Sequence, residues 1–234
     1  MKYMAFFLLI LMLSGCAFLN QPNNTAIEDP ENQIQKTIPQ VFQLHDVPHN
    51  PRKQQGTDCA PDSLRMVLTY RGKQVNEQDI VRHLDSRGAG GGTSFRQMQE
   101  IASKVYNLPS FLIHNCDIDT IKSAILNKWA PIIGYRSGGR YYHAVVAVGY
   151  DEKRRMMFVH DPNILGVRKI RYSDLGGFSE DGVQRLSVLI VLPENATPEE
   201  LAKGLSKYSP KDKIDMLLVS GMLPSQEKSD QIAK

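Results

Sequence analysis

The chain has 234 residues, which is enough for one sizeable domain with shorter segments at its ends. Hydrophobic residues make up 41% of the sequence and charged residues 23%, so wholesale intrinsic disorder is excluded. The formal net charge of +3 comes from 28 basic and 25 acidic residues that are mixed along the chain without a basic block, which argues against a nucleic-acid-binding protein.

The first 15 residues are expected to be a signal peptide, because Lys2 precedes an apolar run over residues 5–13 that is too short to span a bilayer. The following Leu-Ser-Gly-Cys resembles a bacterial lipobox, which implies that Cys16 becomes the lipidated first residue of the mature protein. An ordinary cleaved signal with an incidental cysteine is the alternative. Several acyl chains on Cys16, palmitate among them, would anchor the protein stably to a membrane. By resemblance to lipoprotein sorting, Ala17 favours the outer membrane where the organism has one, so the expected location is the cell envelope, facing the periplasm or the exterior.

Residues 16–40 are rich in Asn, Gln and Pro without apolar periodicity, and they predict a flexible tether before a folded domain over residues 41–193. Helical patterns fill the first half of this domain. The first predicted helix begins at Ala60-Pro61 and ends before Gly72, and the second follows Asn76. Two more helices are predicted, one behind a capping box at Ser94-Phe95-Arg96-Gln97 and one over residues 118–126 behind Asp117.

Short β-branched or aromatic runs separated by turn residues predict strands in the second half, over residues 131–135, 141–150, 156–160, 167–172 and 186–192. Helices followed by an antiparallel sheet indicate an α+β fold. Residues 194–234 are predicted to form a C-terminal appendage for packing or docking. It has two short helices, which start near Thr197 and Ser209, and a polar tail.

Without Cys16, two cysteines remain, Cys59 and Cys116, and in an oxidising compartment they could form a disulfide. The position of Cys59 favours a nucleophile instead, because the start of a helix lowers a thiol pKa and a structural cysteine more often lies inside an apolar run. Asp62 lies so near in sequence that its carboxylate could raise the pKa of Cys59.

His143 lies in a strongly apolar predicted strand, where a residue that can carry charge needs a partner. If the following turn centres near residue 152, residues whose numbers sum to about 304 face each other, and Asp161 is then opposite His143. A carboxylate there would fix the imidazole tautomer and stabilise its charged form. A slip of one residue would favour His160 or Asn163 instead.

Residues 54–68, with the sequence QQGTDCAPDSLRMVL, resemble the nucleophile motif of the bacteriocin-processing, double-glycine cysteine peptidases, which are papain-like. Further blocks resemble that family in the same order, at residues 92–94, 129–133, 143–151 and 161–162. The resemblance implies a papain-like fold with Cys59 as nucleophile, His143 as general base and then acid, and Asp161 as its orienter. It also implies a glutamine that forms an oxyanion hole with the Cys59 amide, with Gln54 better spaced than Gln55.

The sequence therefore predicts a lipid-anchored extracytoplasmic cysteine peptidase that acts on a peptide or protein substrate. Double-glycine leaders are one candidate substrate, but the best-known family members act on them in the cytosol, fused to a transporter. Two alternatives are a catalytically degenerate peptide-binding lipoprotein of a secretion or assembly system, and a cell-wall peptidase. The cell-wall families favour Asp-Cys-Ser-Gly where this chain has Asp-Cys-Ala-Pro. No zinc-ligand spacing is present, and neither a metal nor a cofactor is expected.

Overall fold

Antiparallel strands and the helices packed on them make up the part of the chain that the computed structural model describes, residues 38–49, 59–75, 77–84, 92–136, 142–178, 184–208 and 218–223. The chain divides into two units, residues 1–34 and residues 35–234, and all described residues belong to the second. The predicted signal peptide, Cys16 and the tether up to residue 37 lie outside the described residues. In the described part, no helix combines the length and the apolar character that a membrane span requires.

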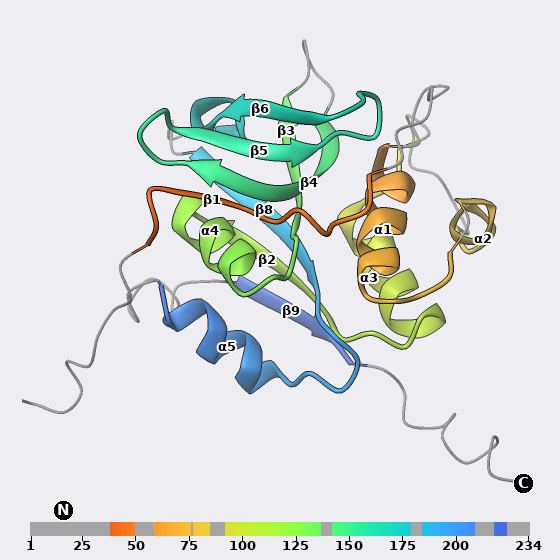
Figure 1. Ribbon diagram of the computed structural model, residues 1–234. Coiled ribbons are helices and arrows are strands. Elements are labelled where there is room, and N and C mark those ends of the chain that lie inside the picture. Colours follow the sequence, from red (N-terminus) through yellow and green to blue (C-terminus); the bar gives the residue numbers. More distant parts are fainter. Residues whose placement is uncertain are drawn as a thin grey trace, which may run out of the picture. The chain divides into compact units, whose positions relative to one another are not determined.

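The described strands belong to one sheet (Figure 1). Its strands follow the order β6 (Val167–Arg171), β5 (Met156–His160), β4 (Tyr142–Asp151), β3 (Ile132–Arg136), β8 (Gln184–Val191), β2 (Ser110–Cys116) and β9 (Leu218–Met222). Two short strands lie off this path, because β1 (Val41–Gln43) pairs with β4 and β7 (Gly177–Phe178) pairs with β8. Each of these strand pairs is antiparallel.

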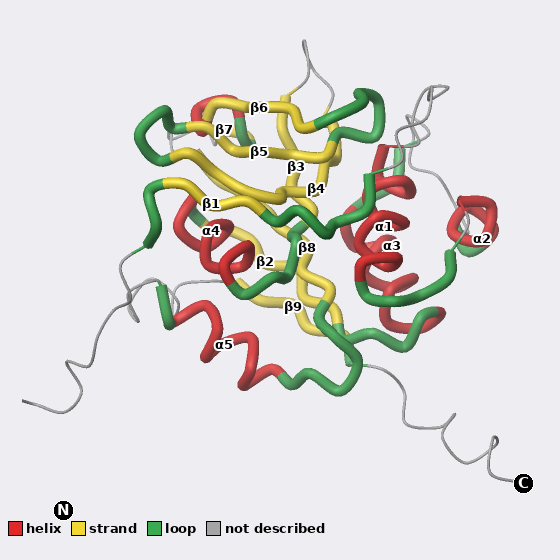
Figure 2. Tube along the Cα trace, in the orientation of Figure 1, coloured by secondary structure: helices red, strands yellow, loops and turns green. Residues whose placement is uncertain are grey.

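The helices form two groups around this sheet (Figure 2). One group holds α1 (Cys59–Tyr70), α2 (Glu77–Arg82) and α3 (Phe95–Glu100), which a π-helical turn over Ile101–Val105 extends. The other group holds α4 (Ile118–Leu126) and α5 (Pro198–Ser206). Both α1 and α4 pack against β4, and every residue of this strand from Ala144 to Tyr150 is buried.

The core forms where α1 meets β4 and β3. Leu64, Val67 and Leu68 of α1 are fully buried, as are Val145 to Val148 of β4. Each buried side chain of this size contributes about 1.5–3 kcal/mol relative to an exposed one. This burial fixes the first turn of α1 against β4, which is where the site described below is formed.

The predicted α+β, papain-like arrangement of helices and an antiparallel sheet is confirmed. Local signals placed α4 correctly, because the Asp117 carboxylate accepts a hydrogen bond from the Thr120 N–H at 2.8 Å and so caps its first turn. The capping box at Ser94 and Gln97 is also present. The strands predicted in the second half agree with β3, β4, β5, β6 and β8 to within one or two residues.

The structure differs from the sequence prediction at four strands, since β1, β2, β7 and β9 were not predicted. Strand β2 lies between α3 and α4 in the chain and between β8 and β9 in the sheet, so helices and strands are not cleanly separated along the sequence. Residues 218–222 were assigned to a helical appendage, yet they form β9 at the edge of the sheet beside β2. The sheet therefore extends past residue 193, and the second C-terminal helix predicted near Ser209 lies outside the described residues.

Candidate active site

Cys59 is the first residue of α1, and its side chain is half-buried. Burial raises the pKa of the Cys59 thiol, but hydrogen bonds with His143 and with the backbone of Ala144 and Ala60, together with the charge of His143, bring it below its ordinary value. Backbone N–H groups at the start of a helix point towards such a group and favour its negative form. The surroundings of Cys59 therefore stabilise a thiolate.

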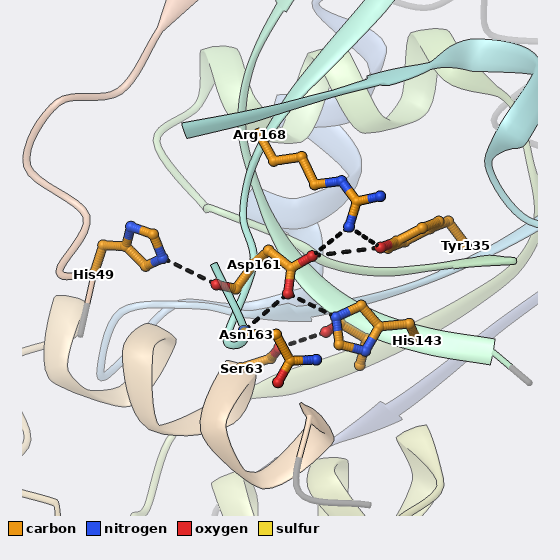
Figure 3. Close-up of polar contacts among 8 residues, drawn as sticks. His49, Ser63, Tyr135, His143, Asp161, Asn163 and Arg168 are labelled. Atoms are coloured by element: carbon orange, nitrogen blue, oxygen red, sulfur yellow. Dashed lines mark hydrogen bonds and ion pairs between the residues drawn. The ribbon is translucent and has the colours of Figure 1, made fainter. Parts of the chain in front are cut away.

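His143, near the start of β4, supplies the imidazole, and Asp161 supplies the carboxylate. The Nε2 atom of His143 lies 2.7 Å from Oδ1 of Asp161, and both side chains are buried (Figure 3). Because Asp161 takes Nε2, Nδ1 is the ring nitrogen left for Cys59. Burial lowers the pKa of His143, but the hydrogen bonds and charges of Asp161 and Cys59 outweigh it and raise that pKa to about 9.

Asp161 stays ionised although its side chain is buried. Burial raises its pKa, whereas hydrogen bonds from His143, from the backbone of Asn163 and from Arg168 lower it, to about 2. A low pKa for the carboxylate and a high pKa for the imidazole describe one coupled pair in which the proton stays on His143. Such a pair can hold an imidazolium next to a thiolate at neutral pH.

The register that was used to predict this contact is wrong, although the two side chains do meet. Val146 pairs with His160, and 146 + 160 gives 306 rather than 304. His143 instead pairs with Tyr135 across β3, and Asp161 lies just past the end of β5. Next to the turn Asp151 pairs with Met156, a sum of 307, so the turn centres between residues 153 and 154 rather than near residue 152. The irregularity between Ala147 and Gly149 then changes the sum from 307 to 306 on the side of the site.

The two alternatives to Asp161 take other positions. His160 stacks on His49, with ring centroids 4.3 Å apart and planes 11° apart. Asn163 contacts Asp161 through its backbone, because its N–H donates to Oδ1 at 2.9 Å. Of the three candidates, Asp161 is the one whose carboxylate lies against the His143 ring.

Several residues around this group were not predicted from the sequence. The hydroxyl of Ser63, one turn after Cys59 on α1, donates to the carbonyl of Ala144 at 3.1 Å and ties the helix to β4 beside His143. His49 donates through Nε2 to the Asp161 carbonyl at 3.0 Å (Figure 3). Tyr135 and Arg168 contact the Asp161 carboxylate. None of them belongs to a local motif, and the sheet pairing brings them together.

Cys59 and Cys116 are both free thiols in the structure, so the disulfide alternative is not formed there. Cys116 is buried on β2, and its thiol donates to the Leu186 carbonyl at 3.2 Å. Burial and the neighbouring Asp117 raise the pKa of Cys116 to about 12, which makes it a poor nucleophile at neutral pH. The surroundings of the two cysteines therefore favour opposite forms, the thiolate at Cys59 and the thiol at Cys116.

Two further expectations concern the immediate neighbours of Cys59. Asp62 is buried and forms an ion pair with Arg65 at 3.2 Å, and the pKa of Cys59 is lowered in spite of this carboxylate. Gln54 and Gln55 lie outside the described residues. Among the described residues, no group of histidine, cysteine and acidic side chains is arranged to hold a metal ion.

A thiol at the start of a helix, an imidazole on a neighbouring strand and a carboxylate that orients it define the papain-like class of cysteine peptidases. The model of the Peptidase_C39 like family matches residues 35–180, which include Cys59, His143 and Asp161. The chain therefore belongs to this family of papain-like cysteine peptidases. No curated protein matches the chain. The family match ends before β8, α5 and β9.

Proposed function

We propose that the protein is a cysteine peptidase that hydrolyses peptide bonds through Cys59, His143 and Asp161. The observation that carries the proposal is the 2.7 Å contact between His143 and Asp161 beside a thiol whose pKa is lowered. Membership of the family supports the reaction class. A protein that only bound peptides would need neither a lowered thiol pKa nor an imidazole held in one orientation.

In the proposed reaction, the Cys59 thiolate attacks the scissile carbonyl carbon, and the electron pair of the C=O bond moves to the oxygen. His143 then gives its proton to the leaving nitrogen, the C–N bond breaks, and a thioester on Cys59 remains. His143, now neutral, takes a proton from water, and the resulting hydroxide attacks the thioester. The C–S bond breaks, the carboxylic product leaves, and the thiolate–imidazolium pair is restored.

The oxyanion formed in each step needs hydrogen-bond donors that are already in place. The backbone N–H of Cys59 at the start of α1 is one donor in this proposal. A glutamine side chain is the second, with Gln54 as the first candidate and Gln55 as the alternative. Replacing each glutamine with Ala separates the two, because removal of an oxyanion-hole donor lowers kcat by about 10²–10³-fold.

We also propose that the enzyme is anchored by lipid on Cys16 and acts outside the cytoplasm. Support comes from the positive, apolar and small-residue pattern of residues 1–16. Incorporation of labelled palmitate into the wild-type protein, and its loss in Cys16→Ser, is the expected result. A Cys16→Ser variant that still fractionates with the membrane would contradict the anchor.

The peptidase proposal is tested with Cys59→Ala and Cys116→Ala as a matched pair. Purified protein is incubated with a peptide library and, separately, with isolated cell wall, and new amino termini and muropeptides are measured. We expect new peptide amino termini with the wild type and Cys116→Ala, and none with Cys59→Ala. Turnover that survives in Cys59→Ala refutes the assignment. Release of muropeptides points to a cell-wall peptidase, and peptide binding without turnover points to a degenerate family member.

A further inference from the structure

The Asp161 carboxylate receives hydrogen bonds on both of its oxygens. Oδ1 accepts from His143 at 2.7 Å and from the Asn163 N–H at 2.9 Å. Oδ2, on the side away from His143, accepts from Nη1 of Arg168 at 2.8 Å and from the Tyr135 hydroxyl at 3.4 Å. The carboxylate therefore cannot rotate about its χ2 bond without breaking contacts on both oxygens.

Arg168 and Tyr135 also contact each other. Nη1 of Arg168 lies 2.5 Å from the Tyr135 hydroxyl oxygen, and the guanidinium carbon lies 5.1 Å from the centre of the Tyr135 ring. The Tyr135 ring in turn meets the His143 ring edge-on, with centroids 5.4 Å apart and planes at 79°. Figure 3 shows Arg168 and Tyr135 together on the side of Asp161 that faces away from His49.

The charges of this group balance only when Arg168 is counted. In the ion-paired form, Cys59 and Asp161 each carry a negative charge and His143 a positive one, which leaves one buried negative charge in excess. Arg168 supplies the missing positive charge from β6, and its side chain is 36% exposed, so its other nitrogens can remain hydrated. Tyr135 of β3 adds a neutral donor, and His49 contacts the main-chain carbonyl of Asp161 rather than its carboxylate.

We propose that Arg168, together with Tyr135, is a positioning residue that keeps the Asp161 carboxylate aimed at His143. The inference rests on the proposed peptidase function, because Arg168 and Tyr135 hold in place one member of the Cys59–His143–Asp161 group. Arg168 lies on β6 at the edge of the sheet, and it contacts none of the atoms that react in the proposed peptidase reaction. Its effect on the reaction therefore passes through Asp161 and His143.

The sign of one pKa change separates positioning from a simple effect of charge. If Arg168 acts only through its charge, its removal takes a cation away from the imidazolium and the pKa of His143 rises. If Arg168 holds Asp161 in place, its removal lets the carboxylate turn away and the pKa of His143 falls. The loss of one charge-assisted hydrogen bond corresponds to a fall of about one pH unit.

The experiment compares Arg168→Met, Arg168→Lys and Tyr135→Phe in the full chain, with Arg171→Met as the matched control. Arg171 lies on the same strand and is exposed. Alkylation of Cys59 by iodoacetamide is followed across pH by peptide mapping, which separates Cys59 from the other cysteines and needs no substrate. The NMR titration of His143 is then measured in the same four variants on a Cys59→Ala background.

We expect the alkaline inflection of Cys59 alkylation to fall by about one pH unit in Arg168→Met and by less in Tyr135→Phe. Arg168→Lys, which keeps the charge without the planar fork, should lie between Arg168→Met and the wild type. Arg171→Met should overlay the wild type. A His143 pKa that rises or stays unchanged in folded Arg168→Met overturns the proposal. If Arg168→Met does not fold, the same result in both Arg168→Lys and Tyr135→Phe overturns it.

The two readouts distinguish failure of this proposal from failure of the proposed function. A wild-type Cys59 that is alkylated like an ordinary free thiol, with a single inflection near pH 8.5, would refute the peptidase assignment. The NMR titration on the Cys59→Ala background would still show whether Arg168 controls the pKa of His143. A fall of the His143 pKa there supports the positioning role whatever the thiol does.

Discussion

Gly204 marks the point where the C-terminal helix α5 meets the rest of the domain, and its replacement with Ala tests that contact. A Cβ atom at Gly204 would lie 2.2 Å from Cη2 and 2.7 Å from Cζ2 of Trp129. Real carbon atoms do not approach so closely, and Trp129 is itself only 8% exposed, so its ring has little room to move. Asn127 also holds the helix here, since its Nδ2 donates to the Gly204 carbonyl at 2.9 Å.

Two effects of opposite sign decide the outcome of Gly204→Ala. Helix propensity alone would stabilise the protein by about 0.5–1 kcal/mol, because glycine inside a helix is less favourable than alanine. Overpacking a buried contact destabilises by about 1–3 kcal/mol. We therefore expect the free energy of unfolding to fall by about 1–2 kcal/mol, which lowers Tm by about 2–8 °C for a domain of this size.

The assay is urea and thermal unfolding followed by intrinsic fluorescence, which reports directly because Trp129 is the single tryptophan of the chain. The native emission of Gly204→Ala should shift to longer wavelength as α5 lifts from the ring. Lys203→Ala, at an exposed position of the same helix, is the control and should change stability by less than about 0.5 kcal/mol. A Gly204→Ala variant that is more stable than the wild type would refute the close contact.

Three further predictions follow from the site. Asp161→Asn removes a partner that raises the pKa of His143, so the alkaline limb of kcat/KM should move down from about pH 9 by roughly 1–2 units. A limb that stays near pH 9 would count against this role of Asp161. Burial and the charge of His49 lower the pKa of His160 to about 4, below its unfolded value of about 6.5. The free energy of unfolding therefore falls by about 2 kcal/mol, after allowance for solvent screening, as pH falls from about 6.5 to 4. In urea titrations at pH 7 and 4.5, His160→Asn should remove this fall. An equal pH dependence in both proteins would contradict the prediction. Ser63→Ala should lower the free energy of unfolding by about 1 kcal/mol, since it breaks the buried bond to the Ala144 carbonyl, and unchanged urea stability would show that this bond contributes nothing.

Local signals made much of the fold predictable. The Asp117 cap, the Ser94 capping box and the Pro-to-Gly pattern of α1 each act within a few residues, so the sequence contains the whole cause. Strands β2 and β9 were missed because β2 is stabilised by pairing with β8 and β9 by pairing with β2, over long sequence separations. An apolar run as short as β2 does not differ by itself from a buried helical segment.

The site, like the fold, was predictable where its signals are local in the sequence. The helix start at Cys59 and the polar His143 in an apolar strand are visible in the sequence, and the hairpin that follows limits the partner of His143 to residues 160–163. The register was wrong because the turn centres between residues 153 and 154 rather than near residue 152, as the pairing of Asp151 with Met156 shows. The irregularity next to Gly149 then changes the pairing by one residue. That glycine is needed where β1 crosses closely, since a Cβ there would lie 2.4 Å from the Phe42 carbonyl oxygen. Arg168 could not be predicted, because its role depends on how β6 and β3 are placed around Asp161.

Capture of the covalent intermediate shows directly whether Cys59 is the nucleophile. A peptide ester that the enzyme hydrolyses is mixed with the enzyme, turnover is stopped by rapid acid quench, and the acyl group is located by peptide mapping. We expect one acyl group per chain on Cys59 and none on Cys116. Steady hydrolysis with no acyl group on Cys59, or with the acyl group on another residue, would contradict it.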